Sequence, residues 1–141
     1  MEICVDFDGT CVPHNYENTG FEIGSIPVLK RLVATGNHLV LFSMRSGRRL
    51  DEAVDWFIQN GILLYGVQYH PEQARHTASN KCYAAIYIDD RNLGCPLKMD
   101  ESVSSRPFID WERAEKWLEE RWVFDEMYTK TFKHPYYVAD T

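Results

Sequence analysis

The chain is most constrained by residues 3–10, a short apolar run that ends in two carboxylates and a glycine. The apolar residues favour a β-strand, in which Asp6 and Asp8, two positions apart, point to the same side. Two anions placed together repel each other and lose hydration when buried, so such a pair normally needs a cation or a shared proton. Gly9 lets the backbone leave the strand sharply, which puts both carboxylates at the strand's carboxyl end, where open α/β sheets bind ligands. We therefore predict a magnesium site with a nucleophilic aspartate.

The composition is that of an ordinary globular domain. With 141 residues, 45% of them hydrophobic and 26% charged, we expect a single domain over residues 1–141. The net charge of −6 argues against nucleic-acid or membrane binding driven by overall charge, although it leaves room for a local basic patch. The four cysteines show no C-x-x-C pairing, so neither a zinc site nor a disulfide framework is indicated. Because a signal peptide and a membrane-spanning apolar run are not evident, we expect a cytoplasmic protein with no membrane partner.

The apolar pattern alternates between strands and helices. Ser25 is a plausible N-cap for the first helix, and Asp110 for the last, which would bear Trp111 to Trp122 on its apolar face. Such alternation predicts an α/β fold with a central, mostly parallel sheet, and no G-x-G-x-x-G motif supports a dinucleotide site. Residues 11–24 are expected to form a flap loop, and the tail at 124–141 has no assigned place. Strands are expected at 2–7, 38–43, 62–69 and 83–88, and helices at 25–36, from about 50 to 61, and at 110–122.

Four chemically distinctive features would meet at the carboxyl ends of these strands, and together they resemble the haloacid dehalogenase-like (HAD) superfamily. Residues 5–10 match its first motif, a hydrophobic residue followed by D-x-D-G-T. Residues 39–43 match the second, an apolar strand that ends in Ser or Thr, and Lys81 stands where the third motif has its lysine. Residues 85–90 match the acidic fourth motif. The resemblance implies a Rossmann-like three-layer sandwich and a magnesium-dependent phosphohydrolase.

The resemblance also implies a role for each site residue. Asp6 would be the nucleophile that forms an aspartyl-phosphate, and Asp8 the general acid and then the base for water. Mg²⁺ would be held by the Asp6 carboxylate, the Asp8 backbone carbonyl and Asp90, with Asp89 as support. The residues implied in holding the substrate phosphate are Ser43, Met44, Arg45 and Lys81.

Each of these assignments has a simpler alternative. Residues 6–9 could form a solvated turn, although Gly9 comes two positions too early for an EF-hand calcium loop. Ser43 could simply end a strand, Lys81 could be an ordinary surface lysine, and Asp89 with Asp90 could form an exposed turn. The five histidines show no metal-ligand spacing and are interpreted as ordinary.

The gaps between motifs indicate which substrates fit. Neither residues 11–24 nor the roughly twenty residues from Gly61 to Lys81 can hold a cap domain with its own core, so we expect no substantial cap and an open site. The flap, the tail or a neighbouring subunit of a homo-oligomer could cover it. We expect a small phosphorylated metabolite or nucleotide. Arg45, Arg48 and Arg49 follow Ser43 and could contact a polyanionic leaving group, although Arg48 and Arg49 could instead pair with Asp51 or Glu52 on the helix surface. Ser43-x-Arg45-x-Gly47, together with residues 88–91, looks like the phosphatase half of polynucleotide kinase-phosphatases, which leaves a nucleic-acid end as an alternative substrate. A non-catalytic HAD-like module that binds a metal or a partner is the other alternative.

Overall fold

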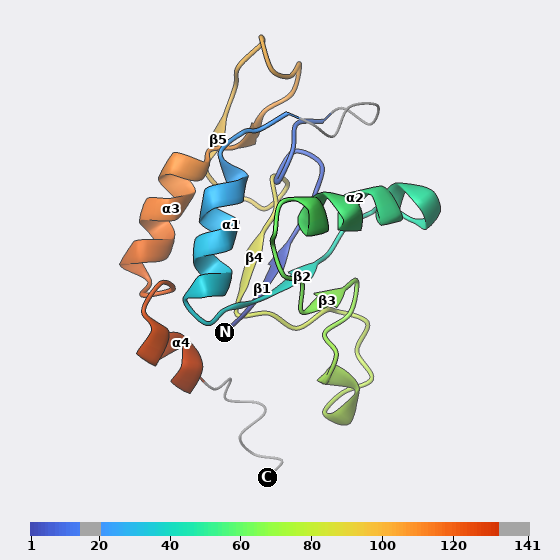
Figure 1. Ribbon diagram of the computed structural model, residues 1–141, viewed down its shortest axis with the longest axis vertical. Helices are drawn as coiled ribbons and strands as arrows, with labels where there is room; N and C mark the ends of the chain where they lie inside the picture. Colours follow the sequence, from blue (N-terminus) through green and yellow to red (C-terminus); the bar gives the residue numbers. More distant parts are fainter. Residues whose placement is uncertain (15–20, 133–141) are drawn as a thin grey trace.

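A four-stranded parallel sheet organises the computed structural model of the protein, which describes residues 1–14 and 21–132 (Figure 1). The strand order is β3-β2-β1-β4, so β1 lies in the middle of the sheet, and a separate antiparallel pair joins β5 to β6. The strands are β1 (Glu2–Val5), β2 (His38–Leu41), β3 (Gly66–Val67), β4 (Ile86–Ile88), β5 (Leu97–Lys98) and β6 (Phe108–Ile109). The helices are α1 (Ser25–Ala34), α2 (Gly47–Gln59), the short 3₁₀ turn η1 (Gln73–Arg75), α3 (Trp111–Glu120) and α4 (Glu126–Thr131). The predicted α/β fold with a parallel central sheet is confirmed.

The main core lies on one face of this sheet. Successive strand residues alternate between faces, and Ile3 and Val5 of β1 pack in one cluster with buried residues of α1, α2 and α3. Phe7 continues this face beyond the strand and meets the Trp56 ring edge-on, with 5.5 Å between ring centroids. Burial of large apolar side chains on this face is what fixes the register of β1 and therefore the position of the carboxylates that follow it.

The opposite face of the sheet is covered differently from the prediction. Cys4 and Val40 point to this side and pack with Cys82 and Ala84 in a small second cluster. Between β3 and β4 the described chain contains η1 and irregular segments rather than a full helix. The predicted three-layer sandwich therefore has two regular layers, and the third is made of loops. Residues 68–85 are mostly polar, so they lack the apolar stripe that a covering helix needs.

Several predicted element ends are corrected by tertiary contacts. Gly24, not Ser25, is the N-cap of α1, because the Ser25 hydroxyl donates instead to the buried Cys11 carbonyl at 2.7 Å. Asp110 does cap α3 as predicted, accepting from the Arg113 amide. Trp122 lies beyond the end of α3 with a φ of 59° and 65% of its surface exposed, so it is not part of the helix's packed face.

The third strand is shorter than predicted, and part of the tail, for which no structure was predicted, forms a helix. β3 keeps only two residues of the predicted 62–69 strand. In the 124–141 tail, α4 packs its Thr129 against the first helix's end, where the Thr129 hydroxyl donates to the Thr35 carbonyl at 2.6 Å. Residues 15–20 of the predicted flap and residues 133–141 of the tail lie outside the described part of the chain. Every helix in residues 1–14 and 21–132 is too short or too polar to cross a bilayer.

Candidate active site

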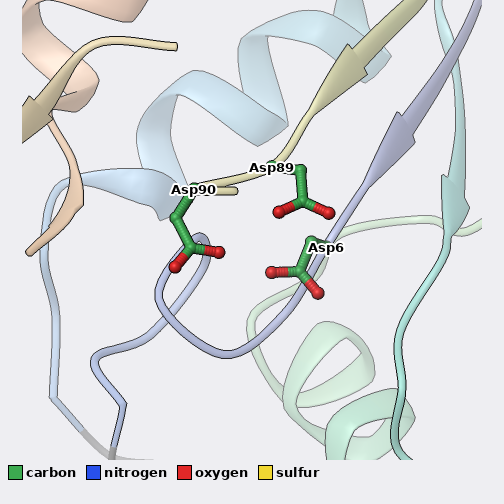
Figure 2. A group of neighbouring side chains, drawn as sticks. All are labelled: Asp6, Asp89 and Asp90. Atoms are coloured by element: carbon green, nitrogen blue, oxygen red, sulfur yellow. The ribbon is translucent and has the colours of Figure 1, made fainter. Parts of the chain in front are cut away.

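Three carboxylates meet at the carboxyl end of the two neighbouring strands β1 and β4 (Figure 2). Val5 pairs with Ile88 across these parallel strands, so the residues that follow them, Asp6 and Asp89-Asp90, come out side by side. One carboxylate oxygen from each aspartate lies within 4.8 Å of the others. The structure thus brings together acidic residues that are more than eighty positions apart in the sequence, as the parallel-sheet argument predicted.

The cluster perturbs the titration of its own members. Burial, together with the negative charge of Asp89, raises the pKa of Asp6 to about 7, against a usual 3.8. The Thr10 hydroxyl donates to Asp6 Oδ2 at 3.0 Å, which opposes part of that rise. Burial is also the main cause that raises the pKa of Asp89. Ionising all three groups is therefore costly unless a cation neutralises them, and hard carboxylate oxygens are the ligands that Mg²⁺ prefers.

Thr10 ties the two strand ends together. Its side chain is completely buried; the hydroxyl donates to Asp6 and accepts from the Asp90 backbone amide at 3.1 Å. The Thr10 carbonyl accepts from the Trp111 indole N–H at 2.7 Å, so the start of α3 holds the same turn. No role was predicted for Thr10, although it is the final residue of the first motif, and that T is the sequence signal that points to it.

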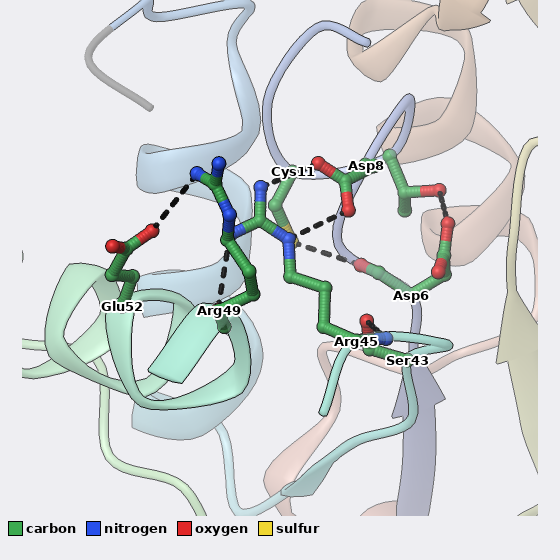
Figure 3. Close-up of polar contacts among 8 residues, drawn as sticks. Asp6, Asp8, Cys11, Ser43, Arg45, Arg49 and Glu52 are labelled. Carbon is green, nitrogen blue, oxygen red and sulfur yellow. Dashed lines mark hydrogen bonds and ion pairs between the residues drawn. The ribbon is translucent and has the colours of Figure 1, made fainter. Parts of the chain in front are cut away.

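The Asp8 carboxylate forms an ion pair with Arg45. Arg45 Nη2 donates to Asp8 Oδ1 at 2.7 Å and Arg45 Nε donates to Asp8 Oδ2 at 2.8 Å, a bidentate pair (Figure 3). The side chains are only 3% and 13% exposed, so the pair is shielded from solvent. Arg45 Nη1 also donates to the Arg49 carbonyl at 3.1 Å, which anchors the guanidinium to the start of α2. Arg45 was predicted to contact substrate phosphate, and its pairing with Asp8 was not foreseen.

The loop after β2 is held by a side chain from the loop after β3. Gln68 accepts from the Ser43 amide at 2.8 Å and donates to the Ser43 carbonyl at 2.7 Å. Gln68 itself has a φ of 67°, in the left-handed region that residues other than glycine seldom adopt. The Ser43 hydroxyl accepts from the Arg45 amide at 3.0 Å, which gives the loop a tight turn. Met44, at the tip of this turn, is 98% exposed.

A cavity of about 600 Å³ connects these groups. Its volume suits a small-molecule ligand. Both signs of charge meet in it, because carboxylates from the β1 and β4 ends face arginines from the second loop and from the segment after β4. The residues that line it are Asp6, Asp8, His14, Ser43, Met44, Arg45, Ser46, Arg49, Asp89, Asp90 and Arg91.

Lys81 is the one predicted site residue that the structure does not bring to this cavity. It precedes β4 on the amino side of the strand, whereas Asp89 and Asp90 follow the carboxyl end. Its side chain is exposed, and its ammonium lies 5.4 Å from the centre of the Tyr87 ring. The loop that carries Lys81 is fixed by Gln73, which donates to the Lys81 carbonyl at 2.6 Å. This placement gives no support to a contact between Lys81 and a phosphate in this cavity.

His14 and Arg91 line the cavity although no site role was predicted for them, and Arg49 lines it as one of the arginines expected near the substrate. His14 was interpreted as an ordinary histidine, but its Nε2 lies 2.7 Å from Asp90 Oδ2. Arg49 pairs with Glu52 of α2 at 3.5 Å, as the surface-pairing alternative for Arg48 and Arg49 expected. Nothing in the spacing of the sequence distinguishes His14 from the other histidines, because its partner is 76 positions away.

Among solved structures, the chain is similar to a conserved protein from Bacteroides thetaiotaomicron. The two sequences are 35% identical, the match covers 86% of this chain and 91% of that chain, and the TM-score is 0.68. The chain belongs to the family of this conserved Bacteroides protein. This relationship shows the family and the fold. No protein-family model and no curated protein matches the chain.

Proposed function

We propose that the chain is a magnesium-dependent phosphohydrolase of the HAD-like type, which hydrolyses a phosphomonoester through an aspartyl-phosphate on Asp6. The observation that carries the proposal is the meeting of the Asp6, Asp89 and Asp90 carboxylates within 4.8 Å at the carboxyl end of adjacent parallel strands. This is the position at which open α/β sheets bind ligands. The order of the sequence motifs, described above, adds the HAD-like assignment.

The donor set fits a divalent cation. Mg²⁺ would be held by the Asp6 and Asp90 carboxylates and the Asp8 backbone carbonyl, with Asp89 in support. When bound, the ion supplies positive charge that offsets the approach of an anionic phosphate to a carboxylate and polarises the phosphoryl oxygen. The raised pKa of Asp6 points the same way, because the burial and negative charge that raise it are what a cation would counteract.

Asp6 is the group placed to attack phosphorus. Its backbone amide donates to the Ile88 carbonyl at 3.0 Å and its Oδ2 accepts from Thr10, so the carboxylate is held at the rim of the sheet. In the first step an Asp6 oxygen bonds to phosphorus as the bond to the leaving oxygen breaks, and the leaving oxygen takes a proton from Asp8. In the second step Asp8 removes a proton from water, which attacks the same phosphorus and releases Asp6.

The Asp8–Arg45 pair must open for this chemistry. A phosphate carries oxyanions that match a guanidinium fork as well as a carboxylate does, so an incoming phosphate can exchange with Asp8 as the partner of Arg45. The exchange would free Asp8 to take a proton from the incoming phosphate monoester. The protonated Asp8 would then lie beside the leaving oxygen as the general acid, while Arg45 and the Ser43 loop hold the transferred group. Lys81 has no part in this mechanism, because it does not line the cavity.

The size of the site supports a small substrate. The cavity of about 600 Å³ accommodates a phosphorylated metabolite or a nucleotide. Between the motifs, described residues 11–14, 21–24 and 61–81 contain η1 and β3 and no further helix or strand that could build a cap. Arg49 and Arg91 at the cavity wall provide cationic surface for the rest of the substrate.

The proposal is tested by phosphate release from a panel of phosphorylated metabolites, nucleotides and p-nitrophenyl phosphate, with and without Mg²⁺. We expect turnover that needs Mg²⁺ and that Asp6→Asn abolishes. Asp51→Asn, an exposed acid on α2, is the matched control and should keep the wild-type rate. Turnover that survives Asp6→Asn, or that is undiminished in EDTA, would remove Asp6 and the cation from the mechanism.

A further inference from the structure

A histidine that the proposed chemistry does not use is bonded to one of the proposed cation ligands. His14 Nε2 lies 2.7 Å from Asp90 Oδ2, and the two side chains are 6% and 8% exposed. A carboxylate oxygen can only accept, so the imidazole Nε2–H donates. The remaining ring nitrogen, Nδ1, is buried and has no hydrogen-bond partner among the described residues. Within the described part of the chain, the bond to Asp90 is therefore the one hydrogen bond that this imidazole makes.

The turn after β1 is shaped around this contact. Gly9 has a φ of 81°, and a Cβ atom built on it would collide with His14 Nε2 and Asp90 Oδ2. Glycine is therefore needed here for two separate reasons, its left-handed backbone and the space that the His14–Asp90 pair occupies. The His14 ring and the Asp90 carboxylate thus fill the space in which a side chain at position 9 would begin.

The contacts of Asp90 with Thr10 hold its backbone more firmly than its carboxylate. The Asp90 backbone amide donates to the Thr10 hydroxyl, which fixes the backbone. The same hydroxyl also lies 3.5 Å from Asp90 Oδ1, but its single proton is directed to Asp6 Oδ2 at 3.0 Å, so Thr10 only weakly restrains rotation of the Asp90 side chain. The contact from His14 to Oδ2 removes that rotation and holds the carboxylate with an oxygen toward Asp6 and Asp89. Hydrogen bonds from outside the ligand set orient carboxylate ligands in this way and raise metal affinity.

We propose that His14 is a positioning residue for the cation site, acting by orienting the Asp90 carboxylate; the inference rests on the function proposed above. His14 touches neither the substrate nor the reacting atoms. Because it lies four positions after Thr10, it also fastens residues 11–14 to the cation site.

The test is Mg²⁺ binding to the substrate-free protein by isothermal titration calorimetry. His14→Ala should weaken Mg²⁺ binding about 10- to 100-fold, the usual loss when an outer hydrogen bond to a metal ligand is removed. His14→Gln, whose amide nitrogen reaches the position of Nε2, should restore most of the affinity, whereas the shorter His14→Asn should not. His38→Ala is the matched control, because His38 is exposed on β2 and stacks on Tyr65 instead of touching an acid.

Four outcomes decide the matter. Weak binding by His14→Ala and His14→Asn with recovery in His14→Gln supports the inference, and circular dichroism without Mg²⁺ shows which variants are folded. If His14→Ala does not fold, the Gln and Asn variants still give the comparison. Equal Mg²⁺ affinity in wild type and all His14 variants, or equal loss in His14→Gln and His14→Asn, overturns the role of His14 and leaves the proposed function intact. A wild-type protein that binds no Mg²⁺ overturns both.

Discussion

Replacing Asp6 by asparagine should make the metal-free protein more stable at pH 8, although it removes the proposed nucleophile. The asparagine side chain keeps the shape of the aspartate and an oxygen that can accept from Thr10, so the change removes charge with little loss of packing. The pKa of Asp6 is raised to about 7 from 3.8. At about 1.4 kcal/mol per unit, this difference corresponds to about 4 kcal/mol of stability that the ionised group costs.

A Coulomb estimate gives the same order. Two charges at 4.8 Å, the span of the cluster, repel by about 3 kcal/mol at an effective dielectric constant of about 20. We therefore expect Asp6→Asn to gain about 2 to 4 kcal/mol over wild type at pH 8 in EDTA, after relaxation of the site.

The sign of the pH dependence follows from the direction of the shift. Between pH 4 and pH 7 the folded protein holds the Asp6 proton more tightly than the unfolded chain does. The wild-type free energy of unfolding should therefore fall as the pH rises through this window and level off above pH 7, and this fall should be weaker in Asp6→Asn. Saturating Mg²⁺ should reverse the order at pH 8, because it stabilises the wild type by mass action and finds only part of its site in the variant.

Urea denaturation at pH 5, 6, 7 and 8, in EDTA and in Mg²⁺, measures these differences. Asp51→Asn is the control for a change of charge on the exposed surface and should shift the curves by no more than about 0.5 kcal/mol. If Asp6→Asn were less stable than wild type at pH 8 in EDTA, with an unchanged pH dependence, then neither the burial of Asp6 nor the repulsion by its acidic neighbours would make the ionised group costly.

Two further substitutions test other parts of the site. Arg45→Ala leaves the Asp8 carboxylate shielded and without its bidentate partner, so the free energy of unfolding, measured in urea, should fall by about 3 kcal/mol. Arg45→Lys should recover part of this loss. If both variants were as stable as wild type, the Asp8–Arg45 pair would contribute nothing to stability. Gly9→Ala combines a φ of 81° with a collision against His14 and Asp90, so it should lower the free energy of unfolding by about 2 kcal/mol or more and weaken Mg²⁺ binding. Gly94→Ala has a φ of 96° but open space around it, so it measures the effect of the left-handed backbone alone. Equal losses in the two glycine variants would show that the collision is unimportant.

The fold and the acidic cluster could be predicted because they depend on local patterns. An apolar run that ends in carboxylates places those carboxylates at the edge of a parallel sheet, and two such runs on adjacent strands meet. This pattern alone is enough to predict that Asp6, Asp89 and Asp90 come together. Their arrangement around a bound cation stays a prediction.

The contacts that could not be predicted depend on tertiary structure. Serine is a residue type that favours the N-cap position, but the Cys11 carbonyl, fourteen positions earlier, accepts the hydrogen bond of the Ser25 hydroxyl. Asp8 and Arg45 meet only because the loops after β1 and β2 are neighbours, and His14 meets Asp90 only because the first turn folds back over β4. Lys81 was placed by its order among the motifs alone; because it precedes the strand predicted at 83–88, it lies at the amino end of β4, opposite the edge where the carboxylates meet.

The central claim is that Asp6 bonds directly to phosphorus beside a divalent cation. Acid quenching during turnover, followed by mass spectrometry of the peptide that contains Asp6, tests it most directly. We expect a fraction of this peptide to carry one phosphoryl group on Asp6 when Mg²⁺ and substrate are present, and none in EDTA or in Asp6→Asn. Rapid turnover with the Asp6 peptide never modified, or a phosphoryl group found on another residue, would contradict the account.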